Sequence, residues 1–330
     1  MTKLTRREWL AGSAATAAAL SVGLMPSRLR AAAPATGKQA PGFYRTKLGD
    51  YELTQVADGA RTFPMPDGFI VNLPKDQSLA AAESAYMPKG QVTIPFNPLV
   101  VNTGSKLIVI DTGNGLGAYE ATKGAAGQMN ANMKAAGIDP NAVDIVLISH
   151  FHGDHIGGLK SADDKPVFPN AEIKVPAAEW AFWTDDANQA KANGFNKAQF
   201  ANVKKMLDGL GDKITKFDAG KEVAPGITSI DTPGHTPGHV SFVIASGNAR
   251  ILVQSDVTNI PSLFLTHPDW QVVFDNDPNL AVTTRHKFFD MAAAEKAAVI
   301  GYHFSFPAVG HVEKDGNGYR LVPAAWNPSI

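Results

Sequence analysis

Short apolar runs separated by turn residues follow one another along the chain from about residue 41 onward. Residues 51–56 alternate apolar and polar side chains, which is typical of a half-buried strand. Residues 143–149 are mostly apolar and β-branched, and this pattern predicts a strand buried on both faces. Further strands are expected at residues 92–101, 106–110, 172–175, 214–217, 227–230, 240–245, 250–254 and 319–323, and just before His303.

Longer stretches between these strands favour helices. Residues 119–136 form one expected helix, which Gly137 and the following Asp139-Pro140 would end. A chain in which strands alternate with helices is expected to fold as a layered α/β protein. The other expected helices are residues 177–183, residues 189–210 with a break at Gly194, and residues 281–297.

Two long segments show no clear periodicity. Residues 61–90 contain several prolines, and residues 257–280 contain scattered aromatic side chains. Long irregular segments within a compact domain are usually functional or mobile. We therefore expect both segments to be irregular and to wall the mouth of an active site.

The first residues have the layout of an export signal. Arg6 and Arg7 precede a mildly apolar, alanine-rich run over residues 10–25, and a small-residue stretch over residues 31–33 resembles a cleavage site. The layout resembles a twin-arginine signal, and the apolar run is too short and too weakly apolar for a confident membrane span. We expect residues 1–36 to be a cleaved signal, residues 37–330 to be a single domain, and the product to be periplasmic or secreted without a stable membrane anchor. An uncleaved anchor or a chance arginine pair is the alternative.

Charge and cysteine content narrow the possible partners. The net charge is −1, and because residues 1–33 carry +4, the remainder carries −5. A mildly acidic protein without a basic run argues against nucleic acid as a partner. The chain has no cysteine, so disulfides are impossible and a metal site must be built mainly from histidine and carboxylate.

The densest cluster of candidate ligands follows the strand at residues 143–149. His150, His152, Asp154 and His155 form a His-x-His-x-Asp-His motif on the expected loop. Imidazole and carboxylate suit zinc and related divalent ions, and four donors so close in sequence can be divided between two ions. A polar loop with hydrogen-bonded histidines is the alternative, and the ligand-like spacing makes it the weaker one.

Other polar residues follow strands in the same way. Ligand sites in layered α/β proteins gather at strand ends, so these residues are expected to converge with the histidine motif. They are Asp111 in Asp111-Thr112-Gly113, His235 and His239 in Pro233-Gly234-His235-Thr236-Pro237-Gly238-His239, Asp256 after Ser255, and His303 in Tyr302-His303-Phe304.

Together these motifs resemble those of the metallo-β-lactamase superfamily of hydrolases. Within it, stretches such as Leu48-Gly49-Asp50-Tyr51-Glu52 and Phe304-Ser305-Phe306-Pro307 are most similar to the methyl parathion hydrolase and lactonase-like group. The resemblance implies an αββα sandwich, in which two mixed sheets pack together with helices on the outer faces.

The resemblance also implies a dinuclear site, with zinc as the expected metal. Asp256 would bridge both ions together with a water or hydroxide, and Asp154 would be a second catalytic carboxylate that carries a proton to the leaving group. Two ions lower the pKa of a bridging water and stabilise an oxyanion. Asp111 and His239 would support the ligands from outside, and His311 would be structural. One ion would take His150, His152 and His235, and the other would take Asp154, His155 and His303.

The implied reaction is hydrolysis of a small ester-like substrate, with lactones and aryl esters ahead of phosphotriesters. The expected pocket walls are poor in Lys and Arg and would favour apolar groups. Candidate wall residues are Trp183, Phe195, Phe264 and Trp270, although ordinary core packing is the alternative for each aromatic.

Four other functions remain to be weighed. A glyoxalase-II-like thioesterase or a β-lactamase would share the metals and differ in the pocket. A non-catalytic binding protein would show a broken ligand set, and here no ligand is missing. A flavodiiron-type oxidoreductase would be expected to carry glutamate in place of His152. The sequence does not choose among oligomeric states, and a homodimer stays possible.

Overall fold

The computed structural model describes residues 35–192 and 194–330, and residues 41–330 form one compact unit. The predicted export signal lies almost wholly outside the described residues, so its prediction stands as made. In the described part of the chain, no helix is both long enough and apolar enough to cross a membrane.

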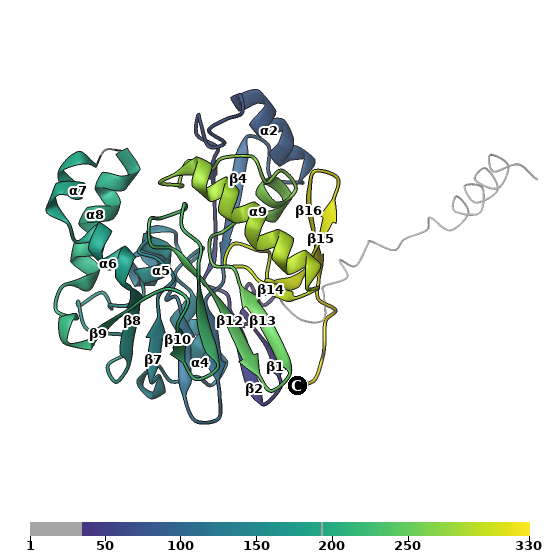
Figure 1. Ribbon diagram of the computed structural model, residues 1–330. Coiled ribbons are helices and arrows are strands. Elements are labelled where there is room, and N and C mark those ends of the chain that lie inside the picture. Colours follow the sequence, from purple (N-terminus) through teal and green to yellow (C-terminus); the bar gives the residue numbers. More distant parts are fainter. Residues whose placement is uncertain (1–34, 193) are drawn as a thin grey trace, which may run out of the picture. The chain divides into compact units, whose positions relative to one another are not determined.

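One seven-stranded sheet comes mainly from the first half of the chain. Strands β7, β8 and β9 are neighbours in this sheet (Figure 1), and the loops that carry Asp111 and the His150 motif follow β6 and β7. The neighbouring pairs β1 with β2, β2 with β5 and β5 with β6 are antiparallel. The pairs β6 with β7, β7 with β8 and β8 with β9 are parallel. In spatial order the strands are β1 (Phe43–Leu48), β2 (Tyr51–Val56), β5 (Leu99–Asn102), β6 (Leu107–Ile110), β7 (Ile145–Leu147), β8 (Glu172–Pro176) and β9 (Ile214–Phe217).

The second seven-stranded sheet follows the order of the sequence. All its pairs are antiparallel except β13 with β14, which are parallel and are connected through a long helix. The strands are β10 (Glu222–Ala224), β11 (Ile227–Asp231), β12 (Val240–Ser246), β13 (Ala249–Val253), β14 (Ala298–Ile300), β15 (Val309–Asp315) and β16 (Gly318–Pro323).

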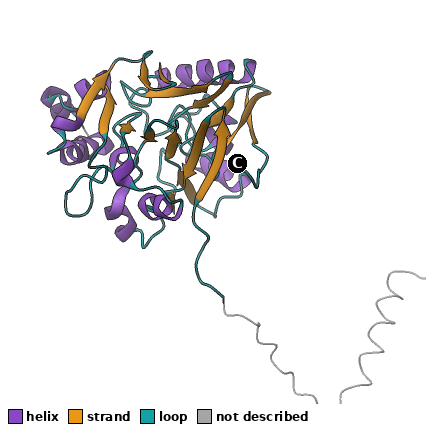
Figure 2. Ribbon diagram, turned by 90° about the horizontal axis from the view of Figure 1, so that it is seen from below, coloured by secondary structure: helices purple, strands orange, loops and turns teal. Residues whose placement is uncertain are grey.

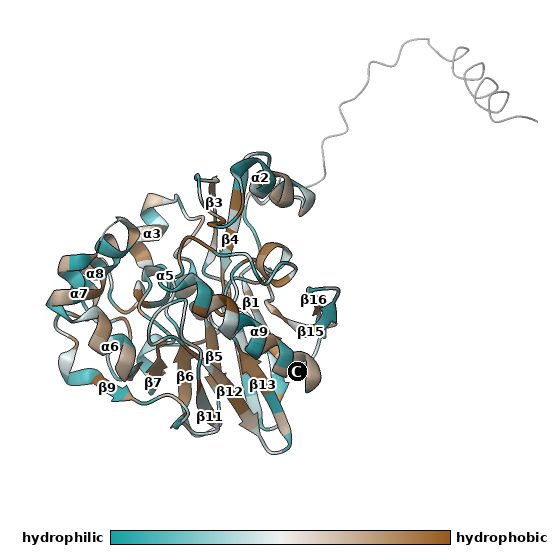
Figure 3. Ribbon diagram, turned by 45° about the horizontal axis from the view of Figure 1, so that its top comes forward, coloured by the Kyte–Doolittle hydropathy of each residue, from teal (hydrophilic) through white to brown (hydrophobic). Residues whose placement is uncertain are grey.

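The two sheets face each other across a shared apolar core. Leu99 and Ile108 from the first sheet and Phe242 and Ile251 from the second belong to one buried cluster. Successive side chains in a strand point to opposite faces, so Val100 and Val109 enter a different cluster on the outer face of the first sheet. Burial on both faces explains why these strands are apolar throughout, as the brown strands of Figure 3 show.

Helices cover the outer faces, which completes the αββα arrangement that the sequence predicted (Figure 2). Phe200 and Val203 of α8 pack on the first sheet, and Phe288 and Phe289 of α9 pack on the second. The helices are α2 (Lys75–Ser84), α3 (Gly115–Ala121), α4 (Met129–Ala135), α5 (Gly153–Ile156), α6 (Ala177–Trp183), α7 (Asp186–Lys191), α8 (Gly194–Leu207) and α9 (Pro278–Ala294), with short turns η1 (Pro140–Ala142), η2 (Gly211–Lys213) and η3 (Pro261–Leu265).

The single strand predicted over residues 92–101 is wrong. Strand β4 (Gln91–Phe96) pairs with β3 (Gly59–Pro64) in a separate two-stranded sheet, and the chain turns at Asn97-Pro98 before β5 begins. The buried Asn97 side chain donates hydrogen bonds to the carbonyls of Tyr302 and Phe304 at 2.9 and 2.7 Å. These long-range bonds stabilise the turn and cannot be read from local periodicity.

The single helix predicted over residues 119–136 is also wrong, because α3 and α4 are separate. Gly124 and Gly127 between them have positive φ angles of 87° and 80°, a region that side chains with a Cβ rarely adopt. A Cβ on Gly127 would also collide with the carbonyl oxygen of Gly115. The glycines therefore follow the end of α3 and let the backbone pass close to α3 before α4 begins.

The segment predicted to be irregular, residues 61–90, contains most of β3 and the whole of α2. The second such segment, residues 257–280, is irregular apart from η3 and the first turn of α9. Strands β10 and β15 were not predicted, since β10 is very short and β15 is largely polar. Strand β1 and the four-residue helix α5, which carries Asp154 and His155 where a loop was expected, were not predicted either. The other strands and helices lie where the sequence placed them, with ends shifted by a few residues.

Candidate active site

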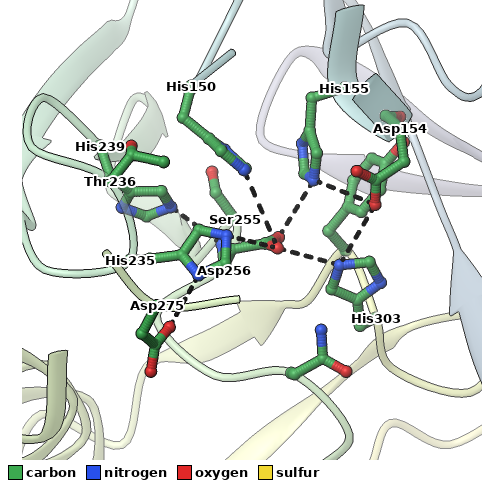
Figure 4. Close-up of polar contacts among 12 residues, drawn as sticks. His150, Asp154, His155, His235, Thr236, His239, Ser255, Asp256, Asp275 and His303 are labelled. Carbon is green, nitrogen blue, oxygen red and sulfur yellow. Dashed lines mark hydrogen bonds and ion pairs between the residues drawn. The ribbon is translucent and has the colours of Figure 1, made fainter. Parts of the chain in front are cut away.

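The predicted ligands come together at one edge of the sandwich, where strands of both sheets end. His150 and His152 lie in the loop after β7, and Asp154 and His155 lie on the short helix α5. The second sheet supplies His235 from the loop between β11 and β12, Asp256 from the loop after β13, and His303 from the loop after β14. Figure 4 shows the side chains of His150, Asp154, His155, His235, Asp256 and His303 pointing toward a common centre.

The Asp256 carboxylate lies at the middle of the cluster. Its Oδ2 is 2.9 Å from His303 Nε2, 3.3 Å from His235 Nε2 and 4.0 Å from His150 Nε2. Its Oδ1 is 3.3 Å from His155 Nε2. Asp154 approaches from the open side, with Oδ2 3.6 Å from His303 Nε2 and 3.7 Å from His155 Nε2.

Five buried polar atoms at this centre lack hydrogen-bond partners among the described residues. They are the Nε2 atoms of four histidines together with Oδ1 of Asp256. Polar atoms removed from water are normally hydrogen-bonded, so this convergence of orphaned atoms indicates a site built for cations. Three sets of possible ligand atoms, each within 4.8 Å of one another, are present: His150, His152 and His235; His150, His155 and Asp256; and Asp154, His155 and His303.

Asp111 orients the first-sheet ligands from behind. Its Oδ2 accepts a hydrogen bond from His155 Nδ1 at 2.8 Å, and its carboxylate also accepts from the backbone N–H and hydroxyl of Ser149, both at 2.8 Å. The Ser149 hydroxyl in turn accepts from His150 Nδ1 at 3.0 Å. With Nδ1 engaged, each ring presents Nε2 to the centre, the arrangement by which carboxylates orient metal-binding histidines.

A second carboxylate orients His235, and the sequence analysis missed it. Asp275, in the loop before α9, accepts a hydrogen bond from His235 Nδ1 at 2.8 Å, and its other oxygen lies 3.6 Å from the guanidinium of Arg285. Asp275 and Arg285 are both fully buried. Arg285 also donates to the carbonyls of Val257, Pro268 and Trp270. No local pattern around Asp275 signals this role, because its partners are distant in sequence.

His239 lies beside the centre without pointing into it. Its Nδ1 donates to the carbonyl of Thr232 at 2.9 Å, and its Nε2 accepts from the backbone N–H of Asp256 at 3.0 Å. Burial lowers the pKa of His239 to about 3, so the ring is neutral and can accept that bond. His239 therefore positions the backbone of Asp256, while His303 is oriented by donating from Nδ1 to the carbonyl of Pro95 at 2.8 Å.

Glu179 of α6 is another buried carboxyl that was not predicted. It accepts hydrogen bonds from the backbone N–H groups of Phe151 and Gly238 at 3.3 and 3.0 Å, and from the hydroxyl of Thr236. Burial raises the pKa of Glu179 to about 7. It thus joins the loop of His150 to the loop of His235, two segments that supply ligands from different sheets.

Burial and neighbouring charges have opposing effects on the pKa values of the clustered residues. Burial, together with the neighbouring imidazoles, holds the pKa values of His150 and His152 well below the usual range. Burial also acts to lower the pKa values of His155 and His303, but Asp256 and other carboxylates outweigh it and raise both. Burial acts to raise the pKa of Asp256, and the same two histidines outweigh it and hold that pKa well below the usual range. Asp256 is thus an anion surrounded by imidazoles.

A cavity of about 340 Å³ opens above the cluster and reaches His152, Asp154, His235, Asp256 and His303. Its other walls are mainly apolar and aromatic, with three side-chain amides among them. Arg61 also lines it, which departs from the expectation of walls poor in cationic residues. The apolar residues are Phe63, Pro66, Ile94, Phe96, Phe195 and Phe274, and the amides are Asn114, Gln199 and Asn259.

Only Phe195 of the four predicted wall aromatics lines this cavity; its ring centroid is 5.3 Å from that of His152. Trp183 is buried in the core beneath the first sheet, although its ring contacts His152 edge-on. Phe264 is fully buried in a cluster with β4, and Trp270 packs against that cluster. Core packing therefore explains these three residues.

His311 contacts residues that lie outside the candidate active site. It is exposed on β15, and its Nδ1 donates to the carbonyl of Lys296 at 3.2 Å. This position agrees with a role outside the candidate ligand set.

Comparison with known proteins adds to this geometry. An N-acyl homoserine lactonase from a Bacillus species is 26% identical over 262 residues, which cover 74% of this chain and 92% of that protein. The solved structure of AidC, a dizinc quorum-quenching lactonase in complex with a product, has a TM-score of 0.80 at 27% identity and covers 87% of this chain and 98% of that chain. The structure of AbOPH, a hydrolase in the beta lactamase superfamily, has a TM-score of 0.80 at 28% identity and covers 88% of this chain and all of that chain.

The family model described as the metallo-beta-lactamase superfamily matches residues 97–303, a range that runs from the turn before β5 to the last candidate ligand. This match and the αββα architecture confirm the resemblance drawn from the motifs. The chain belongs to the metallo-beta-lactamase superfamily.

Proposed function

We propose that this metallo-hydrolase is a lactonase, which opens the ring of an uncharged or weakly charged lactone. Aryl esters would be secondary substrates, and phosphotriesters would follow them. The observation that carries the proposal is the group of orphaned imidazole nitrogens and the Asp256 oxygen on the floor of a largely apolar cavity. The relatives named as lactonases support the choice of lactones over other esters.

Two divalent ions, with zinc as the proposed metal, would bind at this floor. Histidine nitrogen and carboxylate oxygen are ordinary zinc ligands, and seven of them exceed what one tetrahedral ion can take. The orphaned Nε2 atoms fit this assignment, since each lacks another described partner. His150, His152 and His235 would hold one ion, Asp154, His155 and His303 would hold the other, and Asp256 would lie between the two.

When bound, the ions would supply a Lewis acid for the carbonyl oxygen and a source of nucleophilic hydroxide near neutral pH. The protein would do the remaining work. Asp154 is 24% exposed, whereas the side chain of Asp256 is 3% exposed, so Asp154 is better placed to pass a proton to the departing ring oxygen. Asp111, Asp275 and His239 would keep the ligands oriented through the reaction.

The cavity walls would select the substrate. Phe63, Ile94, Phe195 and Phe274 offer apolar surface to an acyl or alkyl group. Arg61 is exposed and adds a single cationic side chain to this wall, which is little charge for holding a phosphomonoester dianion. A single cationic side chain is also too little charge to hold nucleic acid in this cavity.

We further propose that the protein leaves the cytoplasm through the twin-arginine route. The support is the Arg6-Arg7 pair before an alanine-rich apolar run. This route exports proteins already folded, which suits an enzyme whose ligands come from both sheets and converge only after folding.

The test of the activity is a substrate panel with the zinc-loaded protein. Initial rates would be measured on γ-lactones, aryl acetates, a phosphotriester and a phosphomonoester, with the metal content of the same sample determined by elemental analysis. We expect two ions per chain and the highest kcat/KM on a lactone. A protein with two ions bound that turned over the phosphomonoester and ignored every lactone and aryl ester would overturn the proposal.

A further inference from the structure

Tyr302 is buried next to one half of the candidate ligand cluster. It directly precedes His303 in the chain and is 4% exposed. Its hydroxyl donates a hydrogen bond to the backbone carbonyl of Asp154, and its ring centroid is 3.9 Å from that of His155. Tyr302 therefore adjoins all three candidate ligands of one proposed ion, which lie together beside Asp256 (Figure 4).

The Tyr302 hydroxyl satisfies a carbonyl that helix α5 leaves unpaired. This helix is only four residues long, so the carbonyls at its end lack partners within the helix. In a longer helix the N–H of Gly158 would donate to the Asp154 carbonyl, but it donates to the carbonyl of Gly113 at 3.2 Å instead. Among the described residues, only the Tyr302 hydroxyl donates to the Asp154 carbonyl. The hydroxyl thus fixes the backbone of a candidate ligand on the open side of the cluster.

The Tyr302 ring limits the movement of His155. The planes of the two rings are inclined by only 30°, so the tyrosine ring covers a face of the imidazole. Asp111 already holds Nδ1 of His155 at 2.8 Å. A hydrogen bond at one ring atom still lets the imidazole tilt, and a ring packed on its face limits that tilt. Tyr302 and Asp111 together therefore set the direction in which Nε2 of His155 points.

The turn that follows β4 holds Tyr302 in place. The side-chain Nδ2 of Asn97 donates to the carbonyl of Tyr302 at 2.9 Å, and the Phe96 ring meets the Tyr302 ring edge-on, with centroids 6.5 Å apart. The carbonyl of Pro95 accepts from Nδ1 of His303. Tyr302 follows β14 of the second sheet, whereas α5 follows β7 of the first. Tyr302 therefore joins ligand-bearing segments of the two sheets.

Packing explains the ring of Tyr302 and leaves its hydroxyl unexplained. The ring belongs to a buried apolar cluster with Phe69, Ile94 and Phe96. Phenylalanine would fill the same space, whereas a buried tyrosine hydroxyl needs a polar partner. Tyr302 is also not one of the residues that line the cavity above the cluster, so it does not contact a substrate there. Its effect on the site passes through the ligands that it adjoins.

From these contacts we infer that Tyr302 is a positioning residue for one of the two proposed ions. It holds the ligands of that ion, Asp154, His155 and His303, in a fixed arrangement across the two sheets. The inference rests on the two-ion site of the proposed function and adds a residue to it. Loss of Tyr302 should weaken one ion and spare the other. In the described part of the chain, Tyr302 forms no hydrogen bond or ring contact with the candidate ligands of that other ion, His150, His152 and His235.

The experiment removes the hydroxyl alone with Tyr302→Phe, and the hydroxyl and the ring together with Tyr302→Leu. Stepwise competition between the zinc-loaded full chain and a chromophoric chelator gives the affinity of each ion. Loss of a group that supports metal ligands typically weakens binding by about 10- to 100-fold. We expect roughly 10-fold weaker binding of one ion in Tyr302→Phe and roughly 100-fold in Tyr302→Leu, with the other ion unchanged in both.

Substitution with cobalt(II) identifies the ion that is weakened. The Nδ1–H groups of His150, His155, His235 and His303 are all engaged in hydrogen bonds within the protein, which slows their exchange with water. Cobalt bound at Nε2 should shift each of these proton signals in the NMR spectrum. As chelator is added to Tyr302→Leu, the shifted signals of His155 and His303 should disappear first, and those of His150 and His235 should remain.

Tyr319→Phe is the matched control. Tyr319 is 1% exposed, and its hydroxyl donates to Asp290, outside the candidate site. This variant also loses a buried hydroxyl and its hydrogen bond, so both ions should keep the wild-type affinity. Urea unfolding of the metal-free proteins separates a change in metal affinity from a general loss of stability.

Three results would overturn the assignment of Tyr302. They are unchanged affinity for both ions in Tyr302→Phe, equal weakening of both ions, and a wild-type protein that holds a single ion. A wild-type protein that holds two ions and opens no lactone would remove the lactonase proposal and leave the role of Tyr302 intact. The metal titration and the substrate panel therefore test the two proposals separately.

Discussion

Asp275→Asn is the most informative single substitution outside the candidate ligands. Asparagine keeps the size of the side chain and an oxygen that can accept from His235 Nδ1, so the 2.8 Å hydrogen bond can survive. The substitution removes the negative charge that lies 3.6 Å from Arg285. The variant therefore tests the effect of the negative charge of Asp275 while the size of the side chain is kept.

Two effects of defined size should follow. A neutral partner makes His235 a weaker ligand, and loss of such a supporting group typically costs about 10- to 100-fold in metal affinity. The buried Arg285 also loses its counter-charge, and breaking a buried pair typically costs about 3–5 kcal/mol. Arg285 retains its three backbone carbonyl acceptors, so we expect the lower end, about 3 kcal/mol in the free energy of unfolding.

The assay has two parts. Competition with a chromophoric chelator gives the affinity of each ion, and urea unfolding of the metal-free protein gives the stability. One ion should weaken, since His235 belongs to only one of the three candidate ligand sets, and the other should change little. Asp269→Asn is the matched control, because Asp269 is on the same loop, is 76% exposed and pairs with His286. Unchanged affinity for both ions together with unchanged unfolding would refute the reasoning.

Three further predictions concern other parts of the chain. The buried carboxyl of Glu179 has its pKa raised to about 7, so the folded state keeps a proton that the unfolded chain loses above about pH 4.5; stability should fall by about 3 kcal/mol as the pH rises through this window. Glu179→Gln should remove that slope in urea unfolding of the metal-free protein. Asp256→Ala should abolish lactone hydrolysis by metal-replete protein, while His311→Ala should leave most of the initial rate. Changing Arg6 and Arg7 together to Lys should leave the precursor in the cytoplasm, as cell fractionation with immunoblotting would show.

Each of these has a contrary outcome. An identical pH slope in wild-type and Glu179→Gln protein would mean that the carboxyl titrates normally in the fold. Near-normal turnover by a metal-replete Asp256→Ala protein would remove the bridging assignment. Unchanged export of the double-lysine variant would point to another route.

The sequence alone was enough to predict the layered fold and the identity of the candidate ligands. The central strands of both sheets are marked by local apolar runs, because a strand buried on both faces needs apolar side chains at every position. The candidate ligands are marked in the same local way. His150 to His155 stand within six consecutive residues, and Asp256 and His303 each follow an apolar run. Such features can be predicted from a single sequence because they depend only on residues that are neighbours along the chain.

Tertiary structure alone decided how those ligands are supported and what surrounds them. Asp275 orients His235 from 40 residues away, and Glu179 reaches Thr236 across 57 residues, so neither contact leaves a local pattern. The cavity wall has the same origin: Asn114, which lines the cavity, is held by Asp58, 56 residues earlier, which accepts hydrogen bonds from its N–H groups. A buried polar group must find its partner wherever the fold brings one, and spacing along the chain does not record which partner that is.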